Sequence, residues 1–232
     1  MELEAPSKKR IRRRICMDKL VLIAGSAIPG ENLPLNAKIE RPMEKQPEIY
    51  LIRHGETEWS RTGQHTGRTD IDLTEAGRRQ AIEIADRLRG KQFSLVLNSP
   101  LRRAAETCRL AGYADVSQSE PNLMEWNYGQ YEGLTSDQIR EKVPNWTVWT
   151  HPVAGGETKD EVAARALAVI QRAQAAKGDV ALFSHGHLLR MLIATWLGLP
   201  PEDGKMFALA TASITVLGHE RDVPVIQLRP ST

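Results

Sequence analysis

The sequence predicts an α/β fold built on an open sheet, and two observations support this prediction. From residue 47 onward, apolar runs of strand length alternate with segments of helical periodicity, as in an α/β layer structure. Three of these apolar runs lead directly into polar clusters, as strands do when their carboxyl ends form a site at one edge of a sheet. We therefore expect helices that cover a sheet whose carboxyl edge carries the chemistry.

The first part of this region predicts two strands, each followed by a helix. A strand is expected at 48–53, after which Thr74 serves as the N-cap of a helix that ends at Gly90. The periodicity places three residues on the buried face of that helix, namely Ala81, Ala85 and Leu88. A second strand at 93–100 leads into a helix at 101–110.

The second part predicts a long helix and then the remaining strands. Thr158 and Glu161 form a capping box at the start of the helix. Its apolar stripe consists of Val162, Ala166, Val169 and Ala173. The elements expected after it are a strand, a helix and two antiparallel strands, at 179–184, 187–197, 212–219 and 223–229.

The composition indicates a globular protein with a separate N-terminal extension. The chain has 232 residues, of which 41% are hydrophobic, enough to bury a substantial core. Residues 1–46 hold 10 Lys and Arg against 6 Asp and Glu, whereas residues 47–232 hold 21 against 23. We expect a basic, disordered extension at 1–46 and one domain at 47–232. A domain with interspersed charges is not built to bind nucleic acid.

The extension contains the basic run KKRIRRR at 8–14 and an apolar run at 20–28, which imperfectly resemble the first two regions of a signal peptide. Nine apolar residues are too few to span a bilayer. Cys16 and Cys108 are far apart and outside any C-x-x-C spacing, so they support neither a disulfide framework nor a zinc ribbon. We expect a cytoplasmic protein with no membrane partner.

The polar clusters contain two histidines and several arginines. They are Arg53 with His54, the stretch 99–103 that ends at Arg103, and Ser184 with His185. If these groups converge, a tetrahedral phosphoryl group suits them, because its oxygens accept several charged hydrogen bonds. The surrounding positive charge also depresses the pKa of an imidazole and leaves its ring nitrogen free to attack phosphorus.

Four ordered motifs carry a family resemblance: LIRHGETEW, SPLRRAAET, LMEWNYGQYEG and LFSHGH. They resemble the histidine phosphatase superfamily, also called the phosphoglycerate mutase-like superfamily. The resemblance spans residues 48–217 and implies a three-layer fold with a mostly parallel open sheet and helices on both faces.

The resemblance also implies roles for five catalytic residues. His54 looks like the phosphoryl acceptor, and Arg53, Arg103 and His185 look like the pocket that holds the transferred oxygens. Glu125 stands where the family keeps its proton donor. No cofactor or metal is implied, since the arginines and histidine supply the positive charge.

A wider set of residues is expected to bind substrate: Arg53, Ser60, Thr66, Gly67, Arg103, Glu125, Glu157, His185 and Gly186. Ser60 stands where many relatives carry asparagine. For Glu157, compensation of a helix dipole is an equal alternative to a substrate contact. Three tryptophans near this region, Trp126, Trp146 and Trp149, fit either the core or the mouth of the site.

Further stretches look similar to the sedoheptulose-1,7-bisphosphatase-like sugar phosphatases. The expected activity is hydrolysis of a small sugar phosphate or bisphosphate, and the expected partner is a small phosphorylated metabolite. A cofactor-dependent phosphoglycerate mutase is an alternative, although residues 134–156 are short and lack the longer basic segment of the mutases. A non-catalytic module that binds phosphate or a phosphoprotein is a second alternative, against which the intact Glu125 argues.

Overall fold

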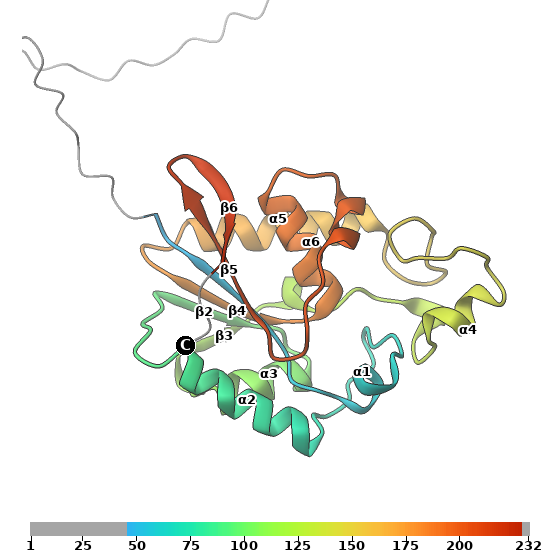
Figure 1. The fold of residues 1–232 in the computed structure, drawn as a ribbon, viewed down its shortest axis with the longest axis horizontal. Helices are drawn as coiled ribbons and strands as arrows, with labels where there is room; N and C mark the ends of the chain where they lie inside the picture. The colour runs from blue at the N-terminus through green and yellow to red at the C-terminus, as the bar shows by residue number, and fades with distance from the viewer. Residues whose placement is uncertain (1–45, 229–232) are drawn as a thin grey trace, which may run out of the picture. The chain divides into compact units, whose positions relative to one another are not determined.

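The computed structural model of the protein describes residues 46–228. The expected basic extension, except for its last residue, lies outside the described residues. The described part contains a six-stranded sheet with helices on both faces, in the order β3-β2-β4-β1-β5-β6 (Figure 1). The strands are β1 Ile49–Arg53, β2 Leu95–Asn98, β3 Ser117–Ser119, β4 Val180–Ser184, β5 Ile214–Glu220 and β6 Val223–Gln227.

The sheet is mixed and mostly parallel. Strand β4 lies at its centre and pairs in parallel with both β1 and β2, and β3 continues the parallel part on the far side of β2. Strand β5 pairs antiparallel with β1, and β6 pairs antiparallel with β5. The predicted antiparallel pair at the end of the chain is therefore confirmed.

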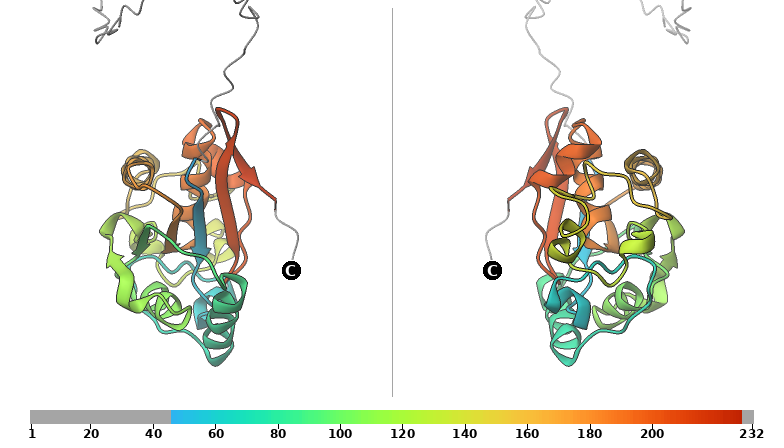
Figure 2. Two further views of the ribbon diagram at one scale, coloured as in Figure 1. Left: turned by 90° about the vertical axis from the view of Figure 1, so that its left-hand side faces the viewer. Right: turned by 90° about the vertical axis from the view of Figure 1, so that its right-hand side faces the viewer.

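The helices cover the two faces of the sheet. They are α1 Glu58–Thr62, α2 Glu75–Arg87, α3 Arg102–Leu110, α4 Ser136–Arg140, α5 Lys159–Gln174 and α6 Gly186–Trp196. Short 3₁₀ helices join them: η1 Ala114–Val116, η2 Pro121–Leu123, η3 Gly129–Tyr131 and η4 Pro201–Met206. Figure 2 shows α5 and α6 on one side of the sheet and α2 and α3 on the other. The predicted three-layer architecture is confirmed.

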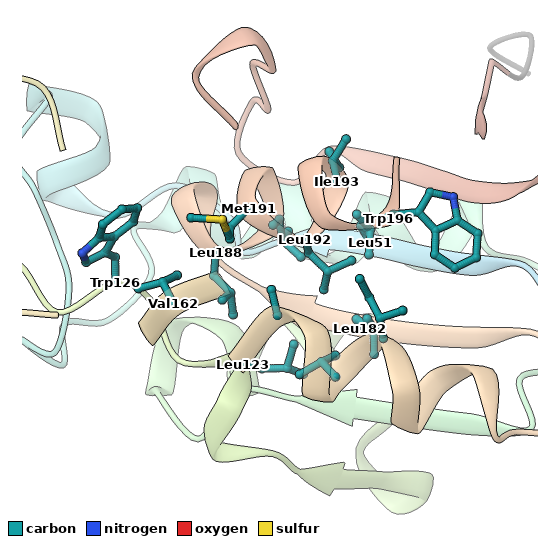
Figure 3. Close-up of a cluster of buried hydrophobic side chains, with 14 of the residues drawn as sticks. Leu51, Leu123, Trp126, Val162, Leu182, Leu188, Met191, Leu192, Ile193 and Trp196 are labelled. Carbon is teal, nitrogen blue, oxygen red and sulfur yellow. The ribbon is translucent and has the colours of Figure 1, made fainter. Parts of the chain in front are cut away.

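Alternation along the strands divides the core between these two layers. Ile49 and Leu51 of β1 belong to the buried cluster that includes α5 and α6, whereas Tyr50 and Ile52 belong to the cluster beneath α2 and α3. Successive side chains of a strand point to opposite faces, so a nearly continuous apolar run is what a sheet covered on both faces requires. Figure 3 shows side chains of α6, among them Leu188, packed in the first of these clusters.

Local signals set the helix boundaries where the sequence predicted them. The Thr74 side chain accepts a hydrogen bond from the amide of Gly77, and Thr158 forms the predicted capping box with Glu161. All four residues of the predicted apolar stripe on α5 are buried. Helix α2 differs slightly from its prediction, because it ends at Arg87 with Leu88 as its C-cap, before the predicted stop at Gly90. On its buried face, Ile84 is buried and Ala85 only half-buried.

The register of the central strands brings their carboxyl ends together. Arg53, the last residue of β1, lies opposite Ser184, the last residue of β4. Backbone hydrogen bonds extend this alignment into the loops: the amide of His54 donates to Ser184, and the amide of Ser99 donates to Phe183. The residues that follow β1, β2 and β4 therefore meet at one edge of the sheet.

Among the described helices, none is long and apolar enough to cross a membrane.

Candidate active site

A cavity of about 300 Å³ lies where these strands end. Arg53, His54 and Glu125 line it, together with loop residues 63–66, Ser60 and the start of α6. Residues 208–209, which precede β5, complete the wall. The volume is at the lower end of the range for small-molecule pockets, which suits a metabolite of a few carbon atoms.

His54 is the buried imidazole of this cavity, with only 4% of its surface exposed. Its Nδ1 atom lies 2.7 Å from the carbonyl oxygen of Gly55. A carbonyl oxygen can only accept, so Nδ1 carries the proton and Nε2 keeps its lone pair. Burial, and then the guanidinium groups of Arg103 and Arg53, hold the pKa of His54 well below its ordinary value. The ring is therefore a neutral nucleophile at neutral pH.

Arg53 supplies a guanidinium group with a spare donor beside His54. Its Nη1 donates to the carbonyl oxygen of Leu209 at 2.5 Å. Its Nε is buried and has no hydrogen-bond partner among residues 46–228. Gly186 packs against this group so closely that a Cβ atom there would lie 3.4 Å from Cζ of Arg53. A buried charged donor without an acceptor is costly.

Arg103 is fully buried behind the cavity and holds a loop in place. Its Nη1 donates to the carbonyl of Thr69 at 3.0 Å, and its Nη2 donates to the carbonyls of Thr66 at 3.0 Å and Gly67 at 2.9 Å. The remaining donor, Nε, lies 3.1 Å from Nδ1 of His185. One cation from α3 thus ties the loop at 66–69 to the loop after β4.

His185 lies directly beside His54, with the two ring centres 5.1 Å apart. Because Arg103 can only donate, Nδ1 of His185 is the acceptor and its Nε2 carries the proton. Nε2 donates to Oγ of Ser99 at 2.8 Å. Burial, followed by the charge of Arg103, keeps the pKa of His185 well below its ordinary value. The ring is neutral and has one fixed orientation.

Glu125 faces the same cavity from the loop after η2 and is 5% exposed. Its carboxylate accepts hydrogen bonds from three backbone amides, those of Trp126 at 2.9 Å, His187 at 3.0 Å and Leu188 at 2.9 Å. Two of these amides belong to the first turn of α6, where unpaired N–H groups favour an anionic side chain. Glu125 is therefore held at a defined position in the wall of the cavity that His54 also lines.

Two of the predicted substrate-binding residues, Ser60 and Thr66, line the cavity. The hydroxyl of Ser60 accepts a hydrogen bond from the amide of Thr57 at 2.9 Å and donates to the Thr57 carbonyl at 3.0 Å, within the capping box of α1. The backbone carbonyl of Thr66 is the one that Arg103 binds. Both residues thus also maintain the wall that they form.

Two other predicted substrate-binding residues, Gly67 and Glu157, do not line the cavity, and neither do the predicted residues Arg103 and His185, which lie behind its wall. A Cβ atom at Gly67 would overlap the carboxylate of Glu132. Glu157 forms a two-pronged ion pair with Arg165, at 2.8 and 2.9 Å, and lies 3.3 Å from Arg68. In this structure both residues hold loops around the cavity.

The cavity residues that were not predicted as site residues include Tyr128, His187 and Arg190. The hydroxyl of Tyr128 lies 2.6 Å from Nδ1 of His187, and burial lowers the pKa of that imidazole well below its ordinary value. A local signal existed, because His187 and Arg190 follow His185 on one helix and Tyr128 lies three residues after Glu125. The tryptophans considered for the mouth, Trp126, Trp146 and Trp149, are all buried.

The arrangement suits transfer of a phosphoryl group. The neutral imidazole of His54, the guanidinium group of Arg53 and the fixed carboxylic group of Glu125 line one cavity. Among residues 46–228, no group of three His, Cys, Asp or Glu side chains could hold a metal ion.

Comparisons with known proteins agree with this chemistry. Residues 49–231 match the family described as the histidine phosphatase superfamily (branch 1). An acid phosphatase of Mycobacterium tuberculosis is 44% identical over 180 residues, which cover 75% of this chain and 88% of the relative. A sedoheptulose 1,7-bisphosphatase of Saccharomyces cerevisiae is 32% identical over 185 residues, which cover 66% of this chain and 68% of the relative. The solved structure of the product of an open reading frame from Mycobacterium tuberculosis superposes with a TM-score of 0.76 at 41% sequence identity. The match covers 79% of this chain and 97% of the chain in that structure.

Proposed function

Because the chain belongs to branch 1 of the histidine phosphatase superfamily and is a metal-independent phosphomonoesterase, we propose that it hydrolyses a small sugar phosphate or bisphosphate through a phosphohistidine at His54. The observation that carries this proposal is the hydrogen bond from Nδ1 of His54 to the Gly55 carbonyl, which leaves Nε2 as the nucleophile. The guanidinium group of Arg53, which lines the same cavity, supports the presence of an anion.

The first half of the reaction forms a bond between Nε2 of His54 and phosphorus and breaks the bond to the leaving oxygen of the substrate. Glu125, which enters this step in its protonated form, donates its proton to that oxygen, so the sugar leaves as an alcohol. The negative charge on the phosphoryl oxygens is stabilised by Arg53, which lines the cavity, and by the positive field of Arg103 behind it.

The second half returns the enzyme to its starting state. Glu125, now ionised, takes a proton from a water molecule, whose oxygen bonds to phosphorus as the phosphorus–nitrogen bond breaks. Inorganic phosphate leaves, and His54 is again neutral. The three amides that bind the Glu125 carboxylate fix its position for both halves of the reaction.

The finer choice of substrate rests on the relatives and on the size of the cavity. One matched relative is named for acid phosphatase activity and another for a sugar bisphosphate. A cavity of about 300 Å³ accommodates a sugar phosphate but little more. We therefore favour small phosphorylated sugars over phosphoproteins.

The nucleophile is tested by rapid quenching during turnover of ³²P-labelled p-nitrophenyl phosphate in EDTA, followed by mapping of the acid-labile label. We expect one phosphohistidine at His54, and no adduct and no turnover in His54→Ala. A label on another residue, or full activity of His54→Ala, would refute the proposed mechanism.

The substrate class is tested by comparing kcat/KM for sugar phosphates, sugar bisphosphates and phosphoglycerates. We expect the sugar compounds to be hydrolysed fastest, with one inorganic phosphate released for each ester group consumed. Fast interconversion of phosphoglycerates in the presence of 2,3-bisphosphoglycerate, without release of phosphate, would identify a mutase. Tight phosphate binding without turnover of any ester would identify a non-catalytic module.

A further inference from the structure

A second cavity, of about 240 Å³, adjoins the one that contains His54. The two cavities share three lining residues, His65, His187 and Arg190. The second cavity extends from these residues toward α4 and the end of η4, where Arg140 and Lys205 also line it. The residues that line the second cavity can therefore contact any molecule that extends beyond the first cavity.

Arg190, on α6, is fixed in place by groups that do not neutralise its charge. Its Nε donates to the carbonyl of Gly204 at 3.0 Å and its Nη2 to the carbonyl of Lys205 at 2.9 Å. Its guanidinium group lies over the ring of Trp149, 5.0 Å from the ring centre. Within residues 46–228, no carboxylate forms an ion pair with Arg190. An oriented guanidinium group without an anion is suited to bind one.

The charges around Arg190 favour an anion rather than a cation. No carboxylate lines the second cavity, and Glu125 is the carboxylate that lines the first. Glu125 is already engaged by three backbone amides. Arg140 and Lys205 have acidic neighbours of their own, Asp137 at 3.2 Å and Asp203 at 3.9 Å, but these do not line either cavity. The field at the junction of the two cavities is therefore positive.

We propose that Arg190 binds a second anionic group of the substrate while the first is held beside His54, so that the preferred substrates are small molecules with two anionic groups. This inference rests on the proposed function, because it takes the group beside His54 to be the reacting phosphoryl. The second group is a phosphate or a carboxylate, since both accept the paired N–H groups of a guanidinium. His65 and His187, which line both cavities, border the path between the two groups.

A binding experiment with the non-reacting His54→Ala protein separates this inference from the proposed function. Calorimetry would compare fructose 1,6-bisphosphate with fructose 1-phosphate and fructose 6-phosphate, and 3-phosphoglycerate with glycerol 3-phosphate. The first comparison tests a second phosphate and the second tests a carboxylate. We expect at least one doubly anionic compound to bind ten times more tightly than its singly anionic partner.

The role of Arg190 is then tested by adding Arg190→Met to this protein, with Arg89→Met as the matched control. Arg89 is an exposed arginine near the end of α2 that is paired with Asp86. We expect the advantage of the doubly anionic compound to fall below threefold with Arg190→Met and to remain with Arg89→Met. Arg190→Gln, which keeps an amide donor for the Gly204 carbonyl, serves as a second neutral variant should Arg190→Met not fold.

The possible results lead to different conclusions. An advantage that survives loss of the Arg190 charge, or no advantage for either pair of compounds, would overturn the inference while leaving the proposed function intact. Failure of every phosphate ester to bind would overturn both.

Discussion

Nδ1 of His54 and the carbonyl oxygen of Gly55, 2.7 Å apart, select which nitrogen of the catalytic ring can react. The carbonyl holds the proton on Nδ1, and burial together with two arginines prevents a second proton from binding to Nε2. The tautomer and the protonation state of the nucleophile are thus both fixed before substrate enters.

Activity should persist at mildly acidic pH. Protonation of Nε2 would block attack on phosphorus, but the pKa of His54 lies well below 6.5, so this loss occurs only at more acidic pH. We expect kcat/KM for p-nitrophenyl phosphate, measured from pH 4 to 8, to show no decline with a midpoint near 6.5. A decline of kcat/KM on acidification with a midpoint at or above pH 6.5 would contradict a buried, neutral nucleophile.

Replacement of Glu125 by Gln should matter most for substrates with poor leaving groups. p-Nitrophenolate leaves without a proton, whereas a sugar alkoxide needs one, and general acid catalysis contributes roughly 10²- to 10⁴-fold. We expect Glu125→Gln to lower kcat by at least about 10²-fold for a sugar phosphate and by much less for p-nitrophenyl phosphate. Equal losses for both substrates would argue against the role of proton donor.

The folded state should lose stability as the pH falls below 6.5. Burial holds the pKa of His54, His185 and His187 well below 6.5 and lowers that of His65 to about 4. The unfolded chain binds these protons at its ordinary pKa while the folded chain does not, so stability is present above 6.5 and decreases below it. Each ring accounts for on the order of 1 kcal/mol between pH 7.5 and 5.5.

Urea unfolding at these two pH values measures the effect. The free energy of unfolding should be several kcal/mol lower at pH 5.5 for the four rings together. His65→Gln should reduce this difference by roughly one quarter. A free energy that does not change between the two pH values would show that the rings are protonated in the folded protein.

Gly77→Ala should destabilise the protein although alanine is the better helix former. Gly77 lies in the first turn of α2, where the backbone crosses the loop after β1, and a Cβ atom there would overlap the carbonyl oxygen of Glu56. We expect a loss of about 1–3 kcal/mol in the free energy of unfolding. Gly178→Ala is the control, because its Cβ would only touch Ser94, at 3.4 Å, and should change stability by less than about 0.5 kcal/mol.

The sequence predicted the elements that have strong local signals. The strands β1 and β4 are apolar runs, and Thr74 and Thr158 are unambiguous helix caps, so their positions follow from short-range physics. Strand β3, with the polar sequence SQS, forms because it pairs with β2 rather than through its own pattern. Elements that depend on a distant partner in this way are not visible in one sequence.

The same distinction applies to the site. His54, Arg53 and His185 directly end or follow strands, so the parallel register brings them together as expected. The pairing of Glu157 with Arg165 depends on how α5 meets the loop before it. The position of Arg190 in the wall of the cavity depends on the rotation of α6 about its axis. Neither angle is encoded in residue spacing, and these two side chains could not be placed beforehand.

The contacts of Arg103 have a consequence for engineering. This side chain donates hydrogen bonds to backbone carbonyl oxygens of the loop at 66–69. Every amino acid carries such a carbonyl, so these hydrogen bonds do not depend on the identity of residue 66. Directed evolution of position 66 can therefore reshape the entrance and retune selectivity while the reacting groups stay where they are.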